Sequence, residues 1–163
     1  MALIQPQKGE AEMAYGEAKI VVHRPSKEIL DFVMDLREYR KVDEKLGKIH
    51  SIKDAEDGEG VLLHFSPKVL GLPGPSTTQR VVRKGNRIDI SGVPAWTDAL
   101  MTFTGFFSCE ETEDGTLVTR ALNFDFRKPF AWLFDPLFTR WLDKAVPEEL
   151  ANAKEYLEAG KHG

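Results

Sequence analysis

The sequence predicts an α+β fold in which one antiparallel sheet packs against helices. Between residues 48 and 127, six runs show the alternation or the β-branched content of strands. Short turns that contain Gly, Asp or Asn separate most of these runs, and such short connections join antiparallel neighbours. Beyond residue 130 the apolar residues recur at helical spacing instead, which predicts a helical layer over the sheet.

Length and composition predict a single domain. The chain has 163 residues, of which 42% are hydrophobic, which is enough for one core but not for two. We expect the domain to span residues 11–160. Residues 1–10 show neither helical nor strand periodicity, so we expect a flexible amino-terminal tail there.

Charge and cysteine content exclude several classes of function. The formal net charge of −4 disfavours a nucleic-acid partner, whose phosphates attract basic surfaces. No window approaches the roughly 20 apolar residues of a transmembrane helix, and no export signal is visible. Cys109 is the only cysteine, so an intrachain disulfide and a cysteine zinc site are both excluded. We therefore expect a cytoplasmic protein. Its oligomeric state is left open.

The first elements are a strand followed by helices. Residues 17–24 alternate so that Ala18, Ile20 and Val22 share one face, which we expect to point inward. An apolar stripe from Ile29 to Leu36 then predicts a helix that begins at Pro25 or Ser26. The charged stretch 37–48 predicts a short second helix or turn. Two short helices should therefore follow the first strand.

The central part of the chain predicts a meander of strands. Six strands are expected here, at residues 48–55, 61–67, 76–84, 87–92, 99–110 and 116–127. With the first strand, the sheet should have about seven strands. Residues 66–76 combine three prolines and two glycines with aliphatic residues, which predicts an apolar loop.

The longest helix is expected at the carboxyl end. Its apolar face begins at Phe134, and charged residues, among them Glu148 and Glu149, fall mostly on the opposite face. Asp135 and Pro136 are expected to form its cap and first turn, because proline at the first helical position loses no hydrogen bond. Pro147 lies further inside, where we expect a kink.

Residues 20–39, IVVHRPSKEILDFVMDLREY, carry a resemblance to a known superfamily. The segment resembles the first strand and helix of the SRPBCC superfamily, which includes START-like lipid-binding domains and polyketide cyclases or dehydratases. The element order matches from about residue 17 to residue 160. A tryptophan often follows shortly after the position of Tyr39 in that superfamily, whereas Val42, Asp43 and Glu44 stand here.

The resemblance implies the helix-grip fold, in which a curved antiparallel sheet of about seven strands wraps around a long carboxy-terminal helix. It also implies a cavity between sheet and helix that holds a hydrophobic or amphipathic small molecule. It implies no particular reaction, because one fold hosts carriers, enzymes and interaction modules.

Strand alternation predicts which side chains line that cavity. Met101, Phe103 and Phe107 share one face of their strand, and Arg120, Leu122, Phe124 and Phe126 share one face of the last strand. The full set of predicted ligand-binding residues is Leu63, Phe65, Met101, Phe103, Phe107, Arg120, Leu122, Phe124, Phe126, Phe138, Trp141 and Leu142. The same side chains could instead form a filled core.

Arg120 interrupts an apolar strand face. An unpaired charge buried there would destabilise the folded protein by roughly several kcal/mol. One interpretation is a cavity cation that binds a ligand carboxylate or phosphate, or pairs with an internal carboxylate. The other is an arginine near a strand end whose stem packs while its head reaches water.

Other reactive residue types give weaker signals. His23 and His64 fall on the strand faces opposite the apolar residues, so we expect both to be exposed, and no histidine has the spacing of a metal site. We expect Cys109 to be a small buried hydrophobe. No cofactor is expected. Val69, Leu70 and Leu72 of the apolar loop are candidates for a gate over the cavity or for transient membrane contact.

Three functions remain open. The first is binding or transport of a lipid, quinone or polyketide-like molecule, with Arg120 and hydroxyls such as those of Tyr39 or Thr102 orienting it. The second is a polyketide cyclase or dehydratase, which an inward His64 or Asp125 would favour. The third is a protein-interaction module with a filled core. Because nothing in the sequence demands a reaction, the non-enzymatic function is favoured over the enzymatic one.

Overall fold

The structure is a computed structural model that describes residues 14–160. Seven strands form one antiparallel sheet in the order β1-β9-β8-β7-β6-β3-β2. These strands are β1 (Ala14–Val22), β2 (Lys48–Asp54), β3 (Val61–Ser66), β6 (Thr77–Lys84), β7 (Arg87–Gly92), β8 (Met101–Thr112) and β9 (Gly115–Phe126). The expected tail at residues 1–10 lies outside the described residues.

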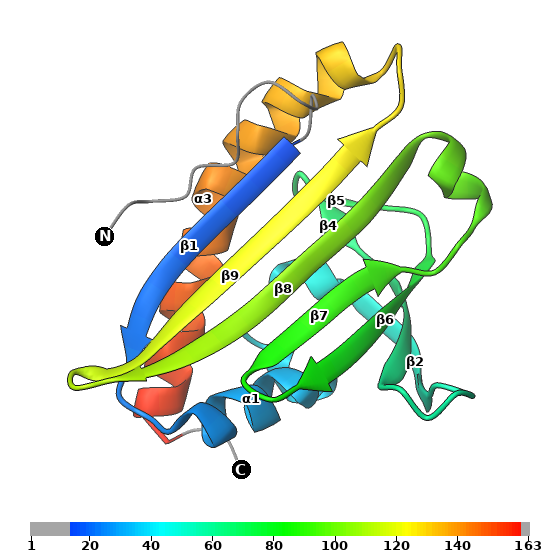
Figure 1. The fold of residues 1–163 in the computed structure, drawn as a ribbon. Helices are drawn as coiled ribbons and strands as arrows, with labels where there is room; N and C mark the ends of the chain where they lie inside the picture. The colour runs from blue at the N-terminus through cyan, green and yellow to red at the C-terminus, as the bar shows by residue number, and fades with distance from the viewer. Residues whose placement is uncertain (1–13, 161–163) are drawn as a thin grey trace.

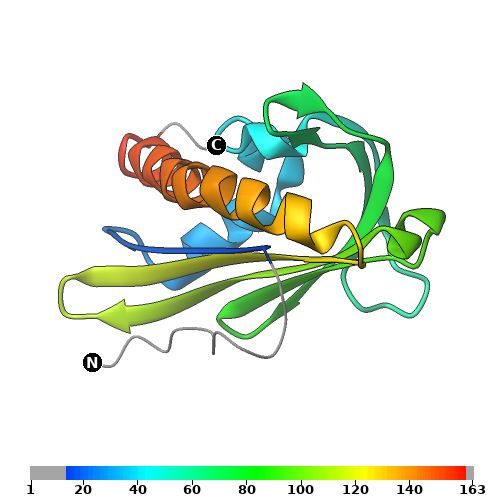
Figure 2. The same ribbon diagram turned by 90° about the horizontal axis from the view of Figure 1, so that it is seen from above.

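The helices follow the predicted order. Two short helices, α1 (Ser26–Met34) and α2 (Leu36–Tyr39), come after the first strand, and the longest helix, α3 (Ala131–Glu158), follows the last strand. Two single-turn helices, η1 (Glu44–Leu46) and η2 (Trp96–Ala99), lie between them. In Figure 2 the curved sheet wraps around α3, which lies along its concave side. The predicted helix-grip fold is therefore confirmed.

The core lies between α3 and the inward face of the sheet. In β9, Val118, Leu122, Phe124 and Phe126 are buried as the alternation predicts. The corresponding face of β1 packs along α3, and these two elements run side by side in Figure 1. Helix α1 buries Ile29, Leu30, Phe32 and Val33 below the other end of the sheet.

Two segments differ from the prediction. Residues expected to form an irregular loop contain a two-stranded hairpin of β4 (Lys68–Val69) and β5 (Leu72–Pro73). In addition, α3 starts at Ala131, so the expected cap at Asp135 and Pro136 is wrong. The helix starts earlier because Ala131 and Phe134 already pack on the core, which outweighs the hydrogen bond that Pro136 removes.

Neither proline breaks the long helix. Pro136 and Pro147 both lie inside α3 and on its exposed side. The helix continues through Pro147, and the kink expected there stays a prediction. No helix within residues 14–160 is long and apolar enough to span a membrane.

Candidate ligand-binding cavity

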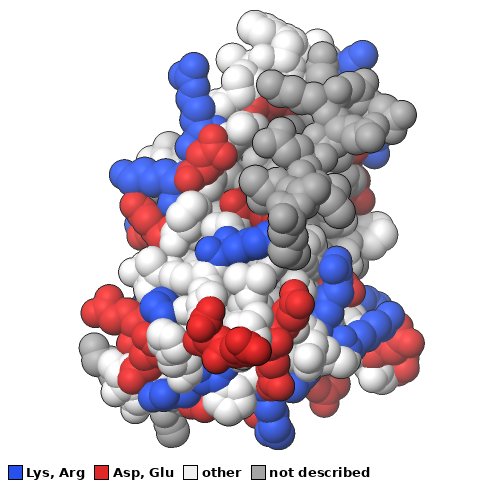
Figure 3. Space-filling model, turned by 60° about the vertical axis from the view of Figure 1, so that its left-hand side comes forward, with Lys and Arg blue, Asp and Glu red and all other residues white. Residues whose placement is uncertain are grey.

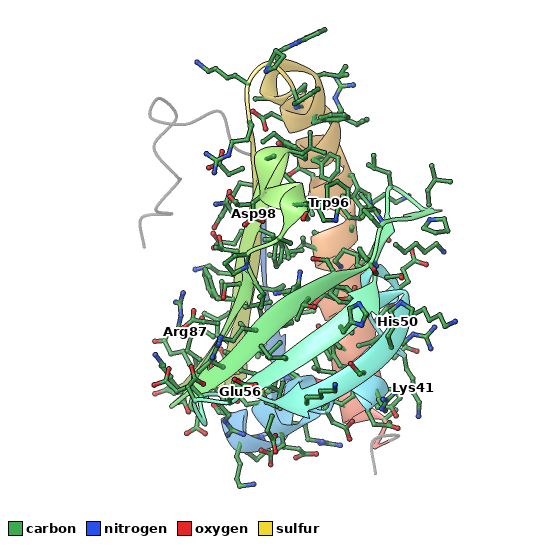
Figure 4. All side chains as sticks on the ribbon, turned by 90° about the vertical axis from the view of Figure 1, so that its right-hand side faces the viewer. Lys41, His50, Glu56, Arg87, Trp96 and Asp98 are labelled. Atoms are coloured by element: carbon green, nitrogen blue, oxygen red, sulfur yellow. The ribbon has the colours of Figure 1, made fainter. Side chains whose placement is uncertain are left out.

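A cavity of about 150 Å³ lies between the middle of α3, the ends of the central strands and the β4–β5 hairpin. Its mouth is bordered by the hairpin and by η2, which Figure 4 shows around Trp96 and Asp98. The lining residues are Asp43, Lys45, Leu46, Phe65, Pro67, Lys68, Val69, Pro75, Thr77, Gln79, Gly92, Val93, Thr97, Asp98, Met101, Thr102, Phe103, Arg120, Leu122, Phe124 and Trp141.

The structure brings several of the predicted residues together in the apolar wall. Strand β8 contributes Met101 and Phe103, β9 contributes Leu122 and Phe124, and α3 contributes Trp141. The rings of Phe103 and Phe124 lie 5.0 Å apart, and those of Phe124 and Trp141 lie 6.4 Å apart. Such an aromatic wall suits a flat or branched apolar ligand. Phe65, Val69 and Arg120 also lie in the wall.

Other predicted residues lie outside the wall. Leu63, Phe107, Phe126, Phe138 and Leu142 are buried in the core. Of the three loop residues expected to form a gate, Val69 lines the cavity, Leu70 packs against the core, and Leu72 is 68% exposed. Alternation identifies the inward face of a strand, but the position of the helix decides which part of that face is covered.

Arg120 is buried at the inner end of the cavity, with 5% of its surface exposed. Its Nε donates to Glu149 Oε2 at 3.1 Å, and its guanidinium carbon lies 4.2 Å from the centre of the Phe107 ring. The interpretation in which the guanidinium of Arg120 reaches water is therefore wrong. The internal carboxylate that pairs with it is Glu149. Nη1 is fully buried, and within residues 14–160 nothing accepts its hydrogen bond.

Glu149 is the centre of a buried polar cluster, which we define as Tyr39, Asp43, Lys45, Arg120 and Glu149. Its carboxylate accepts hydrogen bonds from Arg120, from the Tyr39 hydroxyl and from Lys45 Nζ, the last at 2.6 Å. Lys45 Nζ also lies 2.8 Å from Asp43 Oδ1. The two cations and two carboxylates balance, so the cluster carries no formal net charge.

A local feature of the chain holds Asp43 and Lys45 in the cavity wall. Asp43 caps η1, where its carboxylate accepts a hydrogen bond from the backbone N–H of Lys45 at 3.1 Å. The cap places both side chains toward α3. Gly105 of β8 leaves room for the guanidinium, because a Cβ there would lie 3.3 Å from Arg120 Nη1.

Burial and charge act differently on the two carboxyl groups. For Glu149, burial would raise the pKa, but Arg120 and Lys45 outweigh it and hold the pKa at about 2. For Asp43, burial and then the negative charge of Glu149 raise the pKa, and the nearby cations only partly oppose them. The cavity wall thus contains one firmly ionised carboxylate and one that binds a proton more readily.

Sequence reasoning missed most of this cluster. Glu149 was expected among the charged residues of the outer helix face, yet 2% of its surface is exposed. A signal existed, because Glu149 follows Val146 by three residues and precedes Ala153 by four, and both are buried. Asp43 and Lys45 lie in a charged stretch, where no periodicity marks the inward positions.

The remaining reactive residues lie away from the cavity. His23, His50 and His64 are exposed, as predicted for His23 and His64, and His23 Nδ1 lies 2.8 Å from Glu158. Asp125 is half-buried and outside the lining. Cys109 is buried, and burial raises the pKa of its thiol to about 11, which suits an unreactive core residue. Residues 14–160 contain no cluster of three metal-ligating side chains.

Comparison with known proteins places the chain in a family. Residues 13–158 match the family described as polyketide cyclase / dehydrase and lipid transport. The chain belongs to this family. No match was found among curated proteins. This family match, which covers most of the chain, confirms the SRPBCC resemblance.

Solved structures share the fold at low sequence identity. A protein of Thermus thermophilus is 16% identical with a TM-score of 0.69, over 91% of this chain and 99% of that one. The Zhui aromatase/cyclase of Streptomyces sp. R1128 is 14% identical with a TM-score of 0.66, over 93% and 97%. A START superfamily protein of Mycobacterium smegmatis is 19% identical with a TM-score of 0.61, over 89% and 98%.

Proposed function

We propose that this protein binds a small hydrophobic or amphipathic molecule whose apolar part fills the cavity and whose oxygen accepts a hydrogen bond from Arg120. The observation that supports the proposal is the buried Nη1 of Arg120 in the wall of an apolar cavity, a donor for which residues 14–160 supply no acceptor. An unsatisfied buried donor costs about 1–3 kcal/mol, which a ligand oxygen would recover.

The cluster and the cavity volume narrow the ligand class. Because the buried charges already balance, a carbonyl oxygen suits the site better than a carboxylate, which would add an uncompensated negative charge. A dry protein cavity of roughly 150 Å³ can hold a molecule of the size of benzene. We therefore propose a ring-bearing ketone or quinone, with any longer chain extending through the mouth. The single cysteine favours a cytoplasmic location.

Native mass spectrometry of gently purified protein tests for a ligand, with solvent extraction to identify what is released. We expect a stoichiometric apolar adduct, or uptake from a panel of quinones, aromatic ketones and fatty acids in which the carbonyl compounds bind best. An empty protein that takes up no member of the panel would contradict the proposal and favour the interaction module.

The Arg120→Met variant tests the role of the guanidinium. Losing one charged donor should weaken binding of a carbonyl ligand by about tenfold or more. Arg87→Met is the matched control, because Arg87 also stacks on a phenylalanine, Phe106, but lies on the surface. Should Arg120→Met fold poorly, Trp141→Leu removes part of the apolar wall without touching the buried charges. Equal affinity in wild type and both cavity variants would exclude this site.

A second candidate function is proton transfer, as in a cyclase or dehydratase, and Asp43 is the observation that favours it. This carboxyl lies in the cavity wall, and burial raises its pKa. As a base it would take a proton from the carbon beside a ligand carbonyl, while Arg120 donates to the oxygen that gains the charge. Asp43→Asn should then abolish turnover of a bound β-ketone while leaving its affinity within a few fold. Unchanged turnover would exclude this role.

A further inference from the structure

Six exposed apolar side chains gather at the end of the molecule where α3 begins. They come from η2, the residue just after it, the residue just before α3 and the first two turns of α3. These residues are Trp96, Leu100, Phe130, Trp132, Leu133 and Leu137, which we call the apolar end patch. The two tryptophans are the most exposed, at 78% for Trp96 and 72% for Trp132. Large exposed apolar groups in one place usually mark an interaction surface.

The two segments that carry the patch are joined to each other. The backbone N–H of Arg127 donates to the Leu100 carbonyl at 2.8 Å, and its Nε donates to the Asp98 carbonyl at 3.4 Å. Figures 2 and 4 both place η2 and the start of α3 at the same end of the molecule. The two segments that carry the patch therefore lie next to each other at this end of the molecule.

The first turns of α3 are apolar on the outer side as well as on the side that faces the core. Ala131 and Phe138 face the core, whereas Trp132, Leu133 and Leu137 face outward. One further turn along, the outer side becomes charged, with Arg140, Asp143 and Lys144 all exposed, of which two are basic. Between 45% and 72% of the surface of each outward apolar residue is exposed, so these residues suit an external partner.

Charge indicates which partner. The chain carries a net charge of −4, yet residues 127–144 contain four basic and two acidic residues. The basic ones, Arg127, Lys128, Arg140 and Lys144, flank the patch on both sides along the chain. Figure 3 shows an uncharged region at the upper end of the molecule, with basic side chains on either side of it and acidic side chains just below.

We infer that the apolar end patch docks on the surface of a membrane that contains anionic lipids. Tryptophan favours the boundary between headgroups and acyl chains, and flanking basic residues favour anionic headgroups. A second copy of the chain is a poorer partner, because a symmetric contact would set the same net-positive segment against itself.

The patch adjoins the cavity described above. Thr97, Asp98 and Met101 line the cavity and are neighbours of Trp96 and Leu100 in the chain. Trp141 lines it one turn after Leu137. A docked molecule would therefore hold the cavity mouth near the lipid. The docking inference rests on exposed residues and charge alone, so it does not depend on the proposed ligand.

Co-sedimentation with lipid vesicles tests this surface. We would compare vesicles of phosphatidylcholine with vesicles that also contain phosphatidylserine, using the full chain. We expect binding to the anionic vesicles that weakens with added salt, and a blue shift of tryptophan fluorescence on binding. Trp132→Ser together with Leu133→Ser should weaken binding by at least tenfold, because two apolar anchors are lost. Arg140→Gln together with Lys144→Gln should remove most of the preference for phosphatidylserine.

The matched control is Leu72→Ser. Leu72 is as exposed as the patch residues but lies on the β4–β5 hairpin, so this variant should bind like the wild type. Loss of binding in Leu72→Ser but not in the Trp132 and Leu133 variant would overturn the proposal in favour of the hairpin. No binding to either vesicle would also overturn it. Dimers that dissociate in the Trp132 and Leu133 variant would identify a second copy as the partner. Binding only after removal of residues 1–13 would identify that segment as the occupant.

Discussion

Glu149 accepts hydrogen bonds from three side chains that lie far from it in the sequence. The Tyr39 hydroxyl, Lys45 and Arg120 converge on one carboxylate that water does not reach. Burying a pair of opposite charges gains little by itself, because desolvation offsets the attraction, but removing one partner leaves an uncompensated charge. The cluster therefore fixes the position of Arg120 at the cavity more than it adds stability.

Tyr39→Phe should lower the free energy of unfolding by about 1.5–3 kcal/mol, because a buried carboxylate loses one donor. Urea unfolding at neutral pH measures this change. Tyr15→Phe is the control, since the Tyr15 hydroxyl also donates to a glutamate, Glu17, but at the surface. If Tyr15→Phe lowered the free energy of unfolding as much as Tyr39→Phe, the buried hydrogen bond would be no more stabilising than the one at the surface, and the prediction would be wrong.

At the scale of elements, the edge strand β1 packs closely against α3. Gly16 makes this close approach feasible, because a Cβ at that position would lie 2.5 Å from Leu142 Cβ and 3.2 Å from Val146 Cγ2. Leu142 and Val146 are fully buried. The helix can therefore lie directly on the strand only while residue 16 has no side chain.

Gly16→Ala should destabilise the protein by about 1–3 kcal/mol, because the strand and the helix must separate to admit the methyl group. Thermal unfolding provides the measurement. Gly92→Ala is the control in another strand, where a Cβ would meet nothing closer than the Phe103 carbonyl oxygen at 3.9 Å. Wild-type stability of Gly16→Ala would mean that the approach of β1 to α3 is looser than described.

At the scale of the whole molecule, the buried carboxyl groups make stability depend on pH. Glu149 has a folded pKa of about 2 against an ordinary value of 4.5, so it releases its proton more readily in the folded state. Its contribution to stability is therefore present above pH 4.5 and is lost as the pH falls toward 2. Asp43 has the opposite effect, because its pKa is raised in the folded protein. Protonation of Asp43 therefore stabilises the folded state, and this contribution is lost as the pH rises.

Glu149→Gln should destabilise the protein by about 3–5 kcal/mol at neutral pH, because Arg120 and Lys45 then outnumber Asp43. The difference from the wild type should shrink as the pH falls from 4.5 toward 2, since the wild-type carboxyl becomes neutral there. Denaturant unfolding at several pH values gives both results. A difference that stays constant over this range would contradict the assigned pKa.

The sequence by itself determined the order of elements and the inward face of most strands, because alternation and helical spacing are local properties of the chain. It therefore predicted the antiparallel sheet, the long helix and the aromatic residues of β8 and β9. Pro136 misled the prediction of the helix start, because a capping preference of about 1 kcal/mol is smaller than the gain from packing Phe134.

Tertiary structure alone decided what those faces meet. The partner of Arg120 is 29 residues away in the chain, and Lys45 reaches the same carboxylate across 104 residues. The division between cavity wall and filled core likewise depends on where α3 and the β4–β5 hairpin cover the sheet, which placed Phe103 in the wall and Phe107 in the core. Local patterns specify a direction for each side chain, whereas contacts between distant segments depend on how whole elements pack.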